Sequence, residues 1–181
     1  EKADNPGGGG PGDGTHLLRA MIEAKLEDAC FGFIHDPETV EQAHDAGVGA
    51  TIDVRLGGKK EPIHGEPIET RAYVKCLTDG KFIQQSPMGR GRKVDLGKMA
   101  RLVIDGIDVI VSSIRTQTLD DEVFRLHGIE VTRYKFVAIK SSNHFRAGFA
   151  PIAHKIIRAD TPVLVSADLS TFSYKRLERP L

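Results

Sequence analysis

The chain has 181 residues and carries 25 Lys and Arg against 25 Asp and Glu, so its formal net charge is zero. This balance excludes the whole-domain positive field that attracts nucleic acid or anionic membranes. The hydrophobic fraction of 40% and the charged fraction of 28% are typical of one globular domain, or of one domain with a small appendage. No apolar run approaches the roughly 18 residues that a membrane span needs.

The N-terminal part of the chain alternates helical and strand patterns. Residues 15–27 carry apolar side chains at the spacing of a helix. The short apolar run at 29–34 is typical of a buried strand. Asp36 and Pro37 are the residue types that begin a helix, and we expect that helix to end at Gly47. The pattern predicts a helix, a strand and a second helix.

The middle of the chain has alternating polar and apolar residues interrupted by tight turns. Asp79-Gly80 and Asp105-Gly106 are dipeptides that favour β-hairpins. The predicted strands span residues 50–56, 68–77, 81–85, part of 93–104, and 107–112. We therefore predict an antiparallel sheet here, with 81–85 returning along 68–77.

Helical and strand patterns alternate again in the last third. We predict a helix at 119–126, with Thr118 as its candidate cap, a strand at 134–139, a short helix at 142–150 and a last strand at 155–158. The order of elements along the whole chain predicts an α/β (α+β) fold, in which a mixed β-sheet with an antiparallel, hairpin-rich middle section carries packed helices.

The chain divides by pattern into three segments. We expect a glycine-rich loop at 1–15, an α/β domain at 16–160 and a polar C-terminal tail at 161–181. The chain begins with Glu1 rather than Met, and it ends without a closing element. We expect it to be a piece of a longer protein, with residues 1–15 at the seam between two domains.

Two cysteines, Cys30 and Cys76, each lie within an apolar run and are predicted to be small core residues. No Cys-x-x-Cys pair is present for zinc or redox chemistry. This cysteine usage favours a reducing, cytoplasmic location.

The segment Asp4-Asn5-Pro6-Gly7-Gly8-Gly9-Gly10-Pro11-Gly12-Asp13-Gly14-Thr15 is a candidate binding loop. Glycines let a ligand approach the backbone closely, and the helix that follows offers free N–H groups to an anion such as a carboxylate or phosphate. The loop lacks the Lys of a Walker motif and follows no strand, so it is neither a P-loop nor a Rossmann fingerprint. A flexible interdomain linker is the alternative interpretation.

A second candidate segment is Lys140-Ser141-Ser142-Asn143-His144-Phe145-Arg146, which lies between a predicted strand and a predicted helix. Ligands of open α/β sheets gather at the carboxyl ends of strands. With Ser142 as the helix cap, Arg146 could clamp a carboxylate and His144 could bind a ligand or shuttle a proton. The alternative is that His144 packs on the sheet and Arg146 forms a structural ion pair.

The sequence contains no local motif for a catalytic residue or a metal ligand set, which leaves open a site of His and carboxylate ligands that lie far apart in the sequence. The other histidines are His16, His35, His44, His64, His127 and His154, and none has the spacing of a metal-binding motif. No Gly-x-Ser-x-Gly motif is present either. His35, beside Asp36 at a predicted strand end, is the one other histidine that we would associate with a site.

Several motifs together resemble one known family. The glycine-aspartate loop, Arg55-Leu56-Gly57-Gly58-Lys59, Asp95-Leu96-Gly97 and Lys140-Ser141 with His144-Phe145-Arg146-Ala147 occur in an order similar to that of the C-terminal domain of the microcystinase C (MlrC) family. The resemblance covers nearly the whole chain. It rests most on the loop, which is long and has specific non-glycine positions.

The resemblance implies a function and a division of labour. Members of the family are similar to zinc metallopeptidases, in which metal-activated water attacks an amide carbonyl, and the enzyme that names the family cleaves linearised microcystin peptides. Their zinc ligands and catalytic carboxylate belong to a larger N-terminal domain. The resemblance therefore implies zinc and catalysis in that domain, and no cofactor and no independent activity in this one.

The resulting hypothesis is a substrate-side domain that closes over the cleft of an MlrC-like zinc-dependent peptidase or amide hydrolase. Its expected partners are the N-terminal metal-binding domain of the same protein and a peptide-like small-molecule substrate, with a homodimer left open. The predicted substrate-binding residues are Asn5, Gly8, Gly9, Gly12, Asp13, Gly14, Thr15, His144 and Arg146. The alternatives are a non-catalytic anion- or phosphate-binding module and a structural or dimerisation domain.

Overall fold

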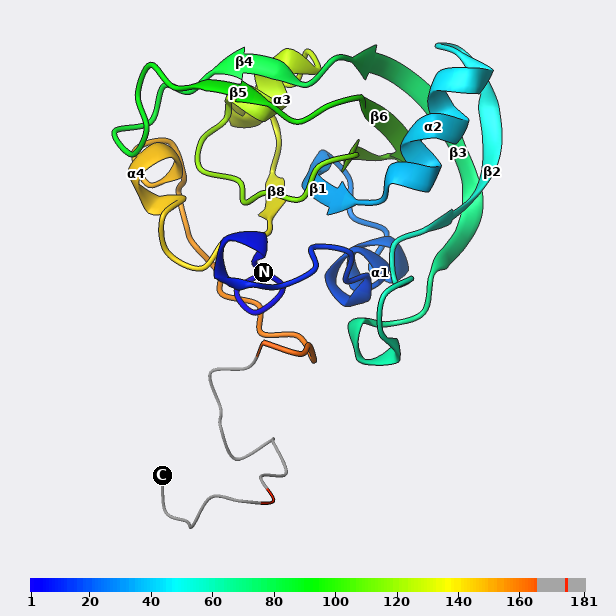
Figure 1. Cartoon of the computed structure of the whole chain (residues 1–181), viewed down its shortest axis with the longest axis horizontal. Coiled ribbons are helices and arrows are strands. Elements are labelled where there is room, and N and C mark those ends of the chain that lie inside the picture. The colour runs from blue at the N-terminus through cyan, green and yellow to red at the C-terminus, as the bar shows by residue number, and fades with distance from the viewer. Residues whose placement is uncertain (166–174, 176–181) are drawn as a thin grey trace.

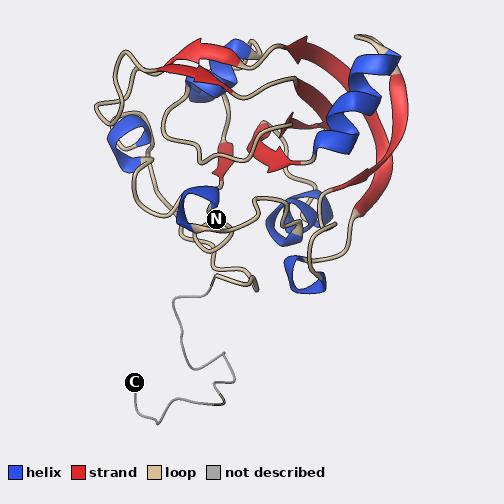
Figure 2. Cartoon of the chain, in the orientation of Figure 1, coloured by secondary structure: helices blue, strands red, loops and turns tan. Residues whose placement is uncertain are grey.

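A computed structural model describes residues 1–165 and residue 175, and most of the predicted tail at 161–181 lies outside the described residues. The predicted α/β class and mixed sheet are confirmed: a six-stranded sheet has the order β2-β3-β6-β7-β1-β8, and β4 and β5 form a separate pair (Figures 1 and 2). The strands are β1 (Ala29–His35), β2 (Thr51–Leu56), β3 (Ile68–Thr78), β4 (Lys81–Ile83), β5 (Lys93–Asp95), β6 (Met99–Ile104), β7 (Ile107–Ser112) and β8 (Phe136–Ile139). The helices are α1 (His16–Glu23), α2 (Pro37–Ala46), α3 (Glu122–Leu126) and α4 (Arg146–Phe149), with short 3₁₀ turns at Pro6–Gly8, Pro62–His64 and Val131–Arg133.

The large sheet has an antiparallel half and a parallel half. Strands β2, β3, β6 and β7 pair antiparallel, as the middle of the sequence predicts. The Asp105-Gly106 hairpin is confirmed, and both residues have the positive φ (47° and 82°) that a type I′ turn requires. Strand β1 lies between β7 and β8 and runs parallel to both. The carboxyl ends of these three parallel strands consequently meet at one edge of the sheet.

The prediction of a β-hairpin at Asp79-Gly80 is wrong. Strand β4 pairs with β5, with Phe82 opposite Val94, and it makes no ladder with β3. Both edges of β3 are already paired, with β2 on one side and β6 on the other, so a returning strand has no free edge to join. The segment 93–104 accordingly contains two strands, one in each sheet.

Two helices are shorter than predicted because the expected cap residues bond elsewhere. The Thr118 hydroxyl donates to the Gly32 carbonyl at 2.8 Å, and α3 starts only at Glu122. The Ser142 hydroxyl donates to the Lys2 carbonyl at 2.9 Å, and α4 starts only at Arg146. Long-range hydrogen bonds thus replace the local caps. Residues 155–158 are not a strand in the structure.

Buried apolar side chains cover both faces of the sheet. Helices α1 and α2 pack on one face through residues such as Leu18 and Val40, while α3 and α4 pack on the other through Phe124 and Phe149. Each fully buried side chain of this size contributes roughly 1.5–3 kcal/mol through the hydrophobic effect. Cys30 lies in this second core as a free thiol, as predicted, and burial raises its pKa to about 12.

The N-terminal segment closes the edge at which the parallel strands end. The α-amino group of Glu1 donates to the Ile139 carbonyl at the end of β8, and the Ser141 N–H donates to the Glu1 carbonyl. The His35 N–H, at the end of β1, donates to the Gly12 carbonyl. Residues 1–15 therefore lie across the carboxyl ends of β1 and β8, the position at which α/β sheets bind ligands.

Candidate functional site

The glycine-rich loop is a closed turn with a buried stem and an exposed tip. The Asn5 carbonyl accepts hydrogen bonds from the N–H groups of Gly8 and Gly10, and the Asn5 side chain accepts one from Gly7 at 3.1 Å. Gly7, Gly8 and Gly9 are exposed, whereas Asn5 before them and Gly10 after them are buried. The loop is therefore held by its own backbone hydrogen bonds rather than extended as a linker.

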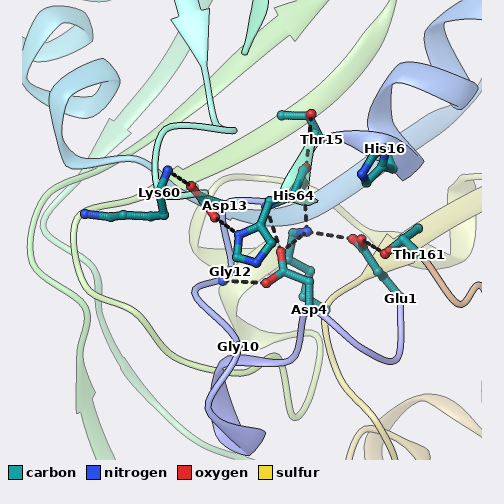
Figure 3. Close-up of polar contacts among 12 residues, drawn as sticks. Glu1, Asp4, Gly10, Gly12, Asp13, Thr15, His16, Lys60, His64 and Thr161 are labelled. Atoms are coloured by element: carbon teal, nitrogen blue, oxygen red, sulfur yellow. Dashed lines mark hydrogen bonds and ion pairs between the residues drawn. The ribbon is translucent and has the colours of Figure 1, made fainter. Parts of the chain in front are cut away.

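A buried ion cluster holds the stem of the loop from inside (Figure 3). The Lys140 ammonium donates to Glu1 at 2.6 Å, to Asp4 at 2.7 Å and to the Gly14 carbonyl at 2.9 Å. The Asp4 carboxylate also accepts the N–H groups of Gly12 and Gly14, each at 2.7 Å. Burial alone would raise the pKa of Asp4, but the Lys140 charge and these hydrogen bonds outweigh it and hold the pKa below its ordinary value.

Asp4 changes what the predicted anion-binding loop can do. The amides of Gly12 and Gly14 are occupied by the chain's own carboxylate. Thr15, which precedes α1, is bonded internally as well: its N–H donates to the His64 carbonyl at 2.9 Å and its hydroxyl donates to the Glu66 carbonyl at 2.8 Å. These N–H groups therefore stabilise the loop itself, and a ligand has to use other groups.

Asp13 forms a second buried pair, with His64. The Nδ1 atom of His64 lies 3.0 Å from one Asp13 oxygen, and the other oxygen accepts the N–H groups of Lys59 at 3.0 Å and Lys60 at 2.9 Å. Both side chains are almost completely buried. The sequence places these partners 51 residues apart and gives no local pattern for His64, so only the fold brings them together.

The Nε2 atom of His64 also has a partner in this arrangement. It accepts a long hydrogen bond of 3.4 Å from the N–H of Leu164. Because Nε2 accepts, Nδ1 carries the proton that is donated to Asp13. The pair thus connects the loop, the 59–64 segment and residue 164. This arrangement is suited to holding the loop in place.

The outer side of the loop faces an open pocket of about 410 Å³. Its lining residues are Gly9, Pro11, His35, Lys60, Glu61, His64, Arg115 and Leu164. His35 ends β1, and Arg115 follows the end of the neighbouring parallel strand β7. The pocket therefore lies at the carboxyl ends of the adjacent parallel strands β1 and β7, the position at which α/β sheets bind ligands.

Besides the acidic Glu61, the pocket is lined by two cationic side chains, those of Lys60 and Arg115. Neither side chain forms an ion pair with a carboxylate among the residues that the structure describes. Burial lowers the pKa of His35, and the charges of Lys60 and Arg115 lower it further against a raising hydrogen bond to Ser113 and the raising charge of Asp13. The imidazole of His35 is thus neutral at pH 7, and the two side chains remain as the cations.

The predicted residues His144 and Arg146 lie on a different flank of the loop. His144 is exposed, and its Nδ1 lies 3.1 Å from the amide nitrogen of Gln117, which also donates to the Ser141 hydroxyl. The guanidinium of Arg146 stacks over the Phe145 ring at 5.3 Å. His144 and Arg146 are not among the residues that line the pocket, and their role in substrate binding stays a prediction.

The described residues do not fit a metal centre. Within 1–165 and 175, no three His, Cys, Asp or Glu side chains come close enough together to hold a metal ion. The Asp13–His64 pair is two groups bonded to each other, which leaves it short of the three protein ligands of a catalytic zinc site. Over the same residues, no helix has the length and apolar character that crossing a bilayer demands.

Comparisons with known proteins agree with the motif-based resemblance. A family model described as MlrC C-terminus matches residues 1–176. Microcystinase C from Sphingomonas sp. is 34% identical over 181 residues, which are 100% of this chain and 34% of that protein. A crystal structure named "Putative metallopeptidase", from Mesorhizobium sp. BNC1, has a TM-score of 0.85 and 27% identity, and the match covers 94% of this chain and 34% of the other. The chain spans about a third of the length of these two relatives.

Proposed function

The chain belongs to the MlrC family, and we propose that it is the C-terminal, substrate-side domain of an MlrC-like, zinc-dependent hydrolase of peptide or amide bonds. In this proposal the domain covers the cleft and binds the substrate, and by itself it has no catalytic activity. Its partners are the metal-binding part of the same protein and a peptide-like small molecule. A cytoplasmic location and a homodimer remain predictions from the sequence.

The observation that carries this proposal is the contrast at the edge of the parallel strands. An internally hydrogen-bonded loop and an open pocket lie there, beside Lys60 and Arg115, which have no carboxylate partner within residues 1–165 and 175. The described residues offer no metal ligand set that could activate water. Binding without the means of catalysis is what a substrate-side domain requires.

The proposal gives the residues of this chain defined roles. Asp4 and Lys140 hold the loop stem, so that the exposed tip at Gly8 and Gly9 faces substrate. The predicted contacts of Asn5, Gly12, Asp13, Gly14 and Thr15 then act mainly through the shape of the loop, because their amide or side-chain groups are hydrogen-bonded internally. In this proposal zinc is bound by the part of the longer protein that lies outside this domain, and none of the described residues is a zinc ligand.

A chimera tests the division of labour. The matched third of microcystinase C from Sphingomonas sp. would be replaced by this chain, and hydrolysis of a linear peptide and bound zinc would be measured in the chimera and in the chain alone. We expect zinc and hydrolysis in the chimera only. Equal activity per mole in the isolated chain would refute the proposed division of labour.

A control separates assembly from substrate binding. Microcystinase C without its matched third should bind zinc but hydrolyse the peptide at least tenfold more slowly than the chimera, because it lacks the substrate-side surface. Full activity of this truncated protein would show that the domain is dispensable for substrate binding and would contradict the proposal.

A further inference from the structure

We propose that the pocket lined by Lys60 and Arg115 is a carboxylate-binding subsite. It takes a small molecule in which a carboxylate adjoins an apolar group, such as the end of a peptide. The inference deepens the proposed function, on which it rests for the identity of the ligand as substrate, but binding of the carboxylate can be measured independently of hydrolysis.

The cations around the loop fall into two groups, those paired with carboxylates and those without a carboxylate partner among the described residues. Lys59 pairs with Asp36 at 3.0 Å and with Glu38 at 2.7 Å, and Lys140 pairs with Glu1 and Asp4. Lys60 and Arg115 have no such partner among residues 1–165 and 175. Their charges therefore remain available to a ligand.

The Arg115 guanidinium lies against the glycine-rich loop. One of its N–H groups donates to the Gly10 carbonyl at 3.4 Å, which brings the side chain against the loop. A guanidinium has five N–H donors in a planar fork that matches a carboxylate. Arg115 thus has donors left for a ligand, and its hydrogen bond to Gly10 reduces the entropy lost on binding.

The nearby acidic groups form no ion pair with either cation among the described residues. Both oxygens of Asp13 are occupied by the N–H groups of Lys59 and Lys60 and by His64, so Asp13 bonds the Lys60 backbone and not its ammonium. The carboxylate of Glu61 is the other acidic group of the lining, and it is exposed to solvent. Lys60 and Arg115 therefore lie near the water-screened charge of Glu61 and the buried charge of Asp13, and neither carboxylate forms an ion pair with them among the described residues.

The pocket has the volume of a small-molecule site and an apolar part to its wall. A volume of about 410 Å³ lies within the roughly 300–1,000 Å³ range of small-molecule sites. Pro11 and Leu164 add apolar wall next to the two cations. This combination suits a carboxylate attached to an apolar side chain better than a bare inorganic anion.

Titration of the 181-residue chain with three probes tests the subsite. N-acetyl-leucine carries a carboxylate and an apolar side chain, N-acetyl-leucinamide is its neutral analogue, and inorganic phosphate is the alternative anion. Binding would be followed at constant ionic strength by calorimetry and by the amide NMR signals of Gly9 and Gly10. We expect N-acetyl-leucine to bind at least tenfold more tightly than either of the other probes.

Substitutions identify the cations that carry the binding. Arg115→Gln and Lys60→Gln should each weaken binding of N-acetyl-leucine about tenfold or more, since each removes a charge-assisted hydrogen bond. Lys75→Gln removes an exposed cation on β3 that does not line the pocket, and it should leave the affinity unchanged. Both pocket cations are exposed, so these variants are expected to fold.

Three outcomes would overturn the subsite: equal binding of the neutral amide, tighter binding of phosphate, or an affinity unaffected by Arg115→Gln and Lys60→Gln. The proposed function is tested separately, by the activity of the chimera. Carboxylate binding by the chain together with an inactive chimera would leave the subsite standing and count against the hydrolase.

Discussion

The two sides of the glycine-rich loop use the same residue types in opposite ways. On the inner side, Lys140 is fully buried, and Glu1, Asp4 and the Gly14 carbonyl saturate its three N–H donors. On the outer side, the exposed Lys60 has no carboxylate partner in the described part of the chain. A saturated cation stabilises the fold, whereas an unsaturated one beside a pocket is available to a ligand. The difference separates residues that build the site from residues that use it.

The largest expected effect is on the inner side. Lys140→Met would leave the carboxylates of Glu1 and Asp4 buried without their counter-ion, and breaking a buried pair in this way costs about 3–5 kcal/mol. Urea denaturation followed by circular dichroism measures the loss. Lys135→Met is the matched control, because its pair with Asp28 is exposed and worth at most about 1 kcal/mol. Similar losses in the two variants would contradict a structural role for Lys140.

The pH dependence of stability sharpens the same comparison. Burial lowers the pKa of His127 from 6.5 to about 4, so the unfolded chain binds the proton first and stability falls as the pH drops from 6.5 to 4, by at most about 3 kcal/mol. The pKa of Asp4 is held below its unfolded value of 3.8, so its contribution is lost only as the pH falls below that value. Unfolding free energies measured by urea denaturation between pH 7 and pH 3 should show both windows.

Two variants test whether His127 and Asp4 cause the loss of stability in these two pH ranges. His127→Gln should flatten the dependence of the unfolding free energy on pH between pH 4 and pH 6.5, where His35, whose pKa is also lowered by burial, still contributes in the same direction. Asp4→Asn should flatten the slope below pH 4 and leave the upper window unchanged. An unchanged low-pH slope in Asp4→Asn would show that the inner cluster does not depend on the ionised Asp4.

Glycine substitutions compare the stem of the loop with its tip. A Cβ at Gly14 would lie 2.7 Å from an Asp4 oxygen, inside the ion cluster, so Gly14→Ala should cost about 1–3 kcal/mol through overpacking. A Cβ at Gly9 would meet no atom within 4 Å, and the cost of Gly9→Ala comes only from its φ of 97°, about 1 kcal/mol. Thermal melting would rank the two variants, and a greater loss at Gly9 would contradict the rigid stem.

The smallest expected effect on stability is on the outer side. Arg115→Gln removes an exposed guanidinium with one long hydrogen bond, to Gly10, so stability should change by no more than about 0.5 kcal/mol. The same urea experiment measures it. A loss comparable to that of Lys140→Met would make Arg115 part of the scaffold.

Much of the fold was predictable because its signals are local. Asp36 caps α2 as predicted, accepting the Thr39 N–H at 3.2 Å, and Pro37 is the first helical residue. The Asp105-Gly106 turn fixes the β6–β7 hairpin. The Asp79-Gly80 signal failed because strand pairing depends on which sheet edges are free, and a dipeptide carries no information about that.

The candidate site was less predictable because long-range contacts build it. The loop was recognisable from its glycines and from the family resemblance, yet its partners Lys140 and His64 lie 136 and 51 residues from the aspartates that they bond. Arg115 lies in no motif, and only the parallel pairing of β1 with β7 brings it beside the loop. The carboxylate clamp that the sequence suggested at Arg146 is now proposed at Arg115 and Lys60.

The most direct test of the account is the effect of Arg115→Gln on kcat/KM in the chimera with microcystinase C. If the outer side of the loop binds substrate, kcat/KM for a peptide with a free carboxylate should fall about tenfold relative to the chimera carrying Lys75→Gln, with the melting temperatures of the two unchanged. Equal kcat/KM values in these two chimeras would contradict the claim that this edge of the sheet serves the substrate.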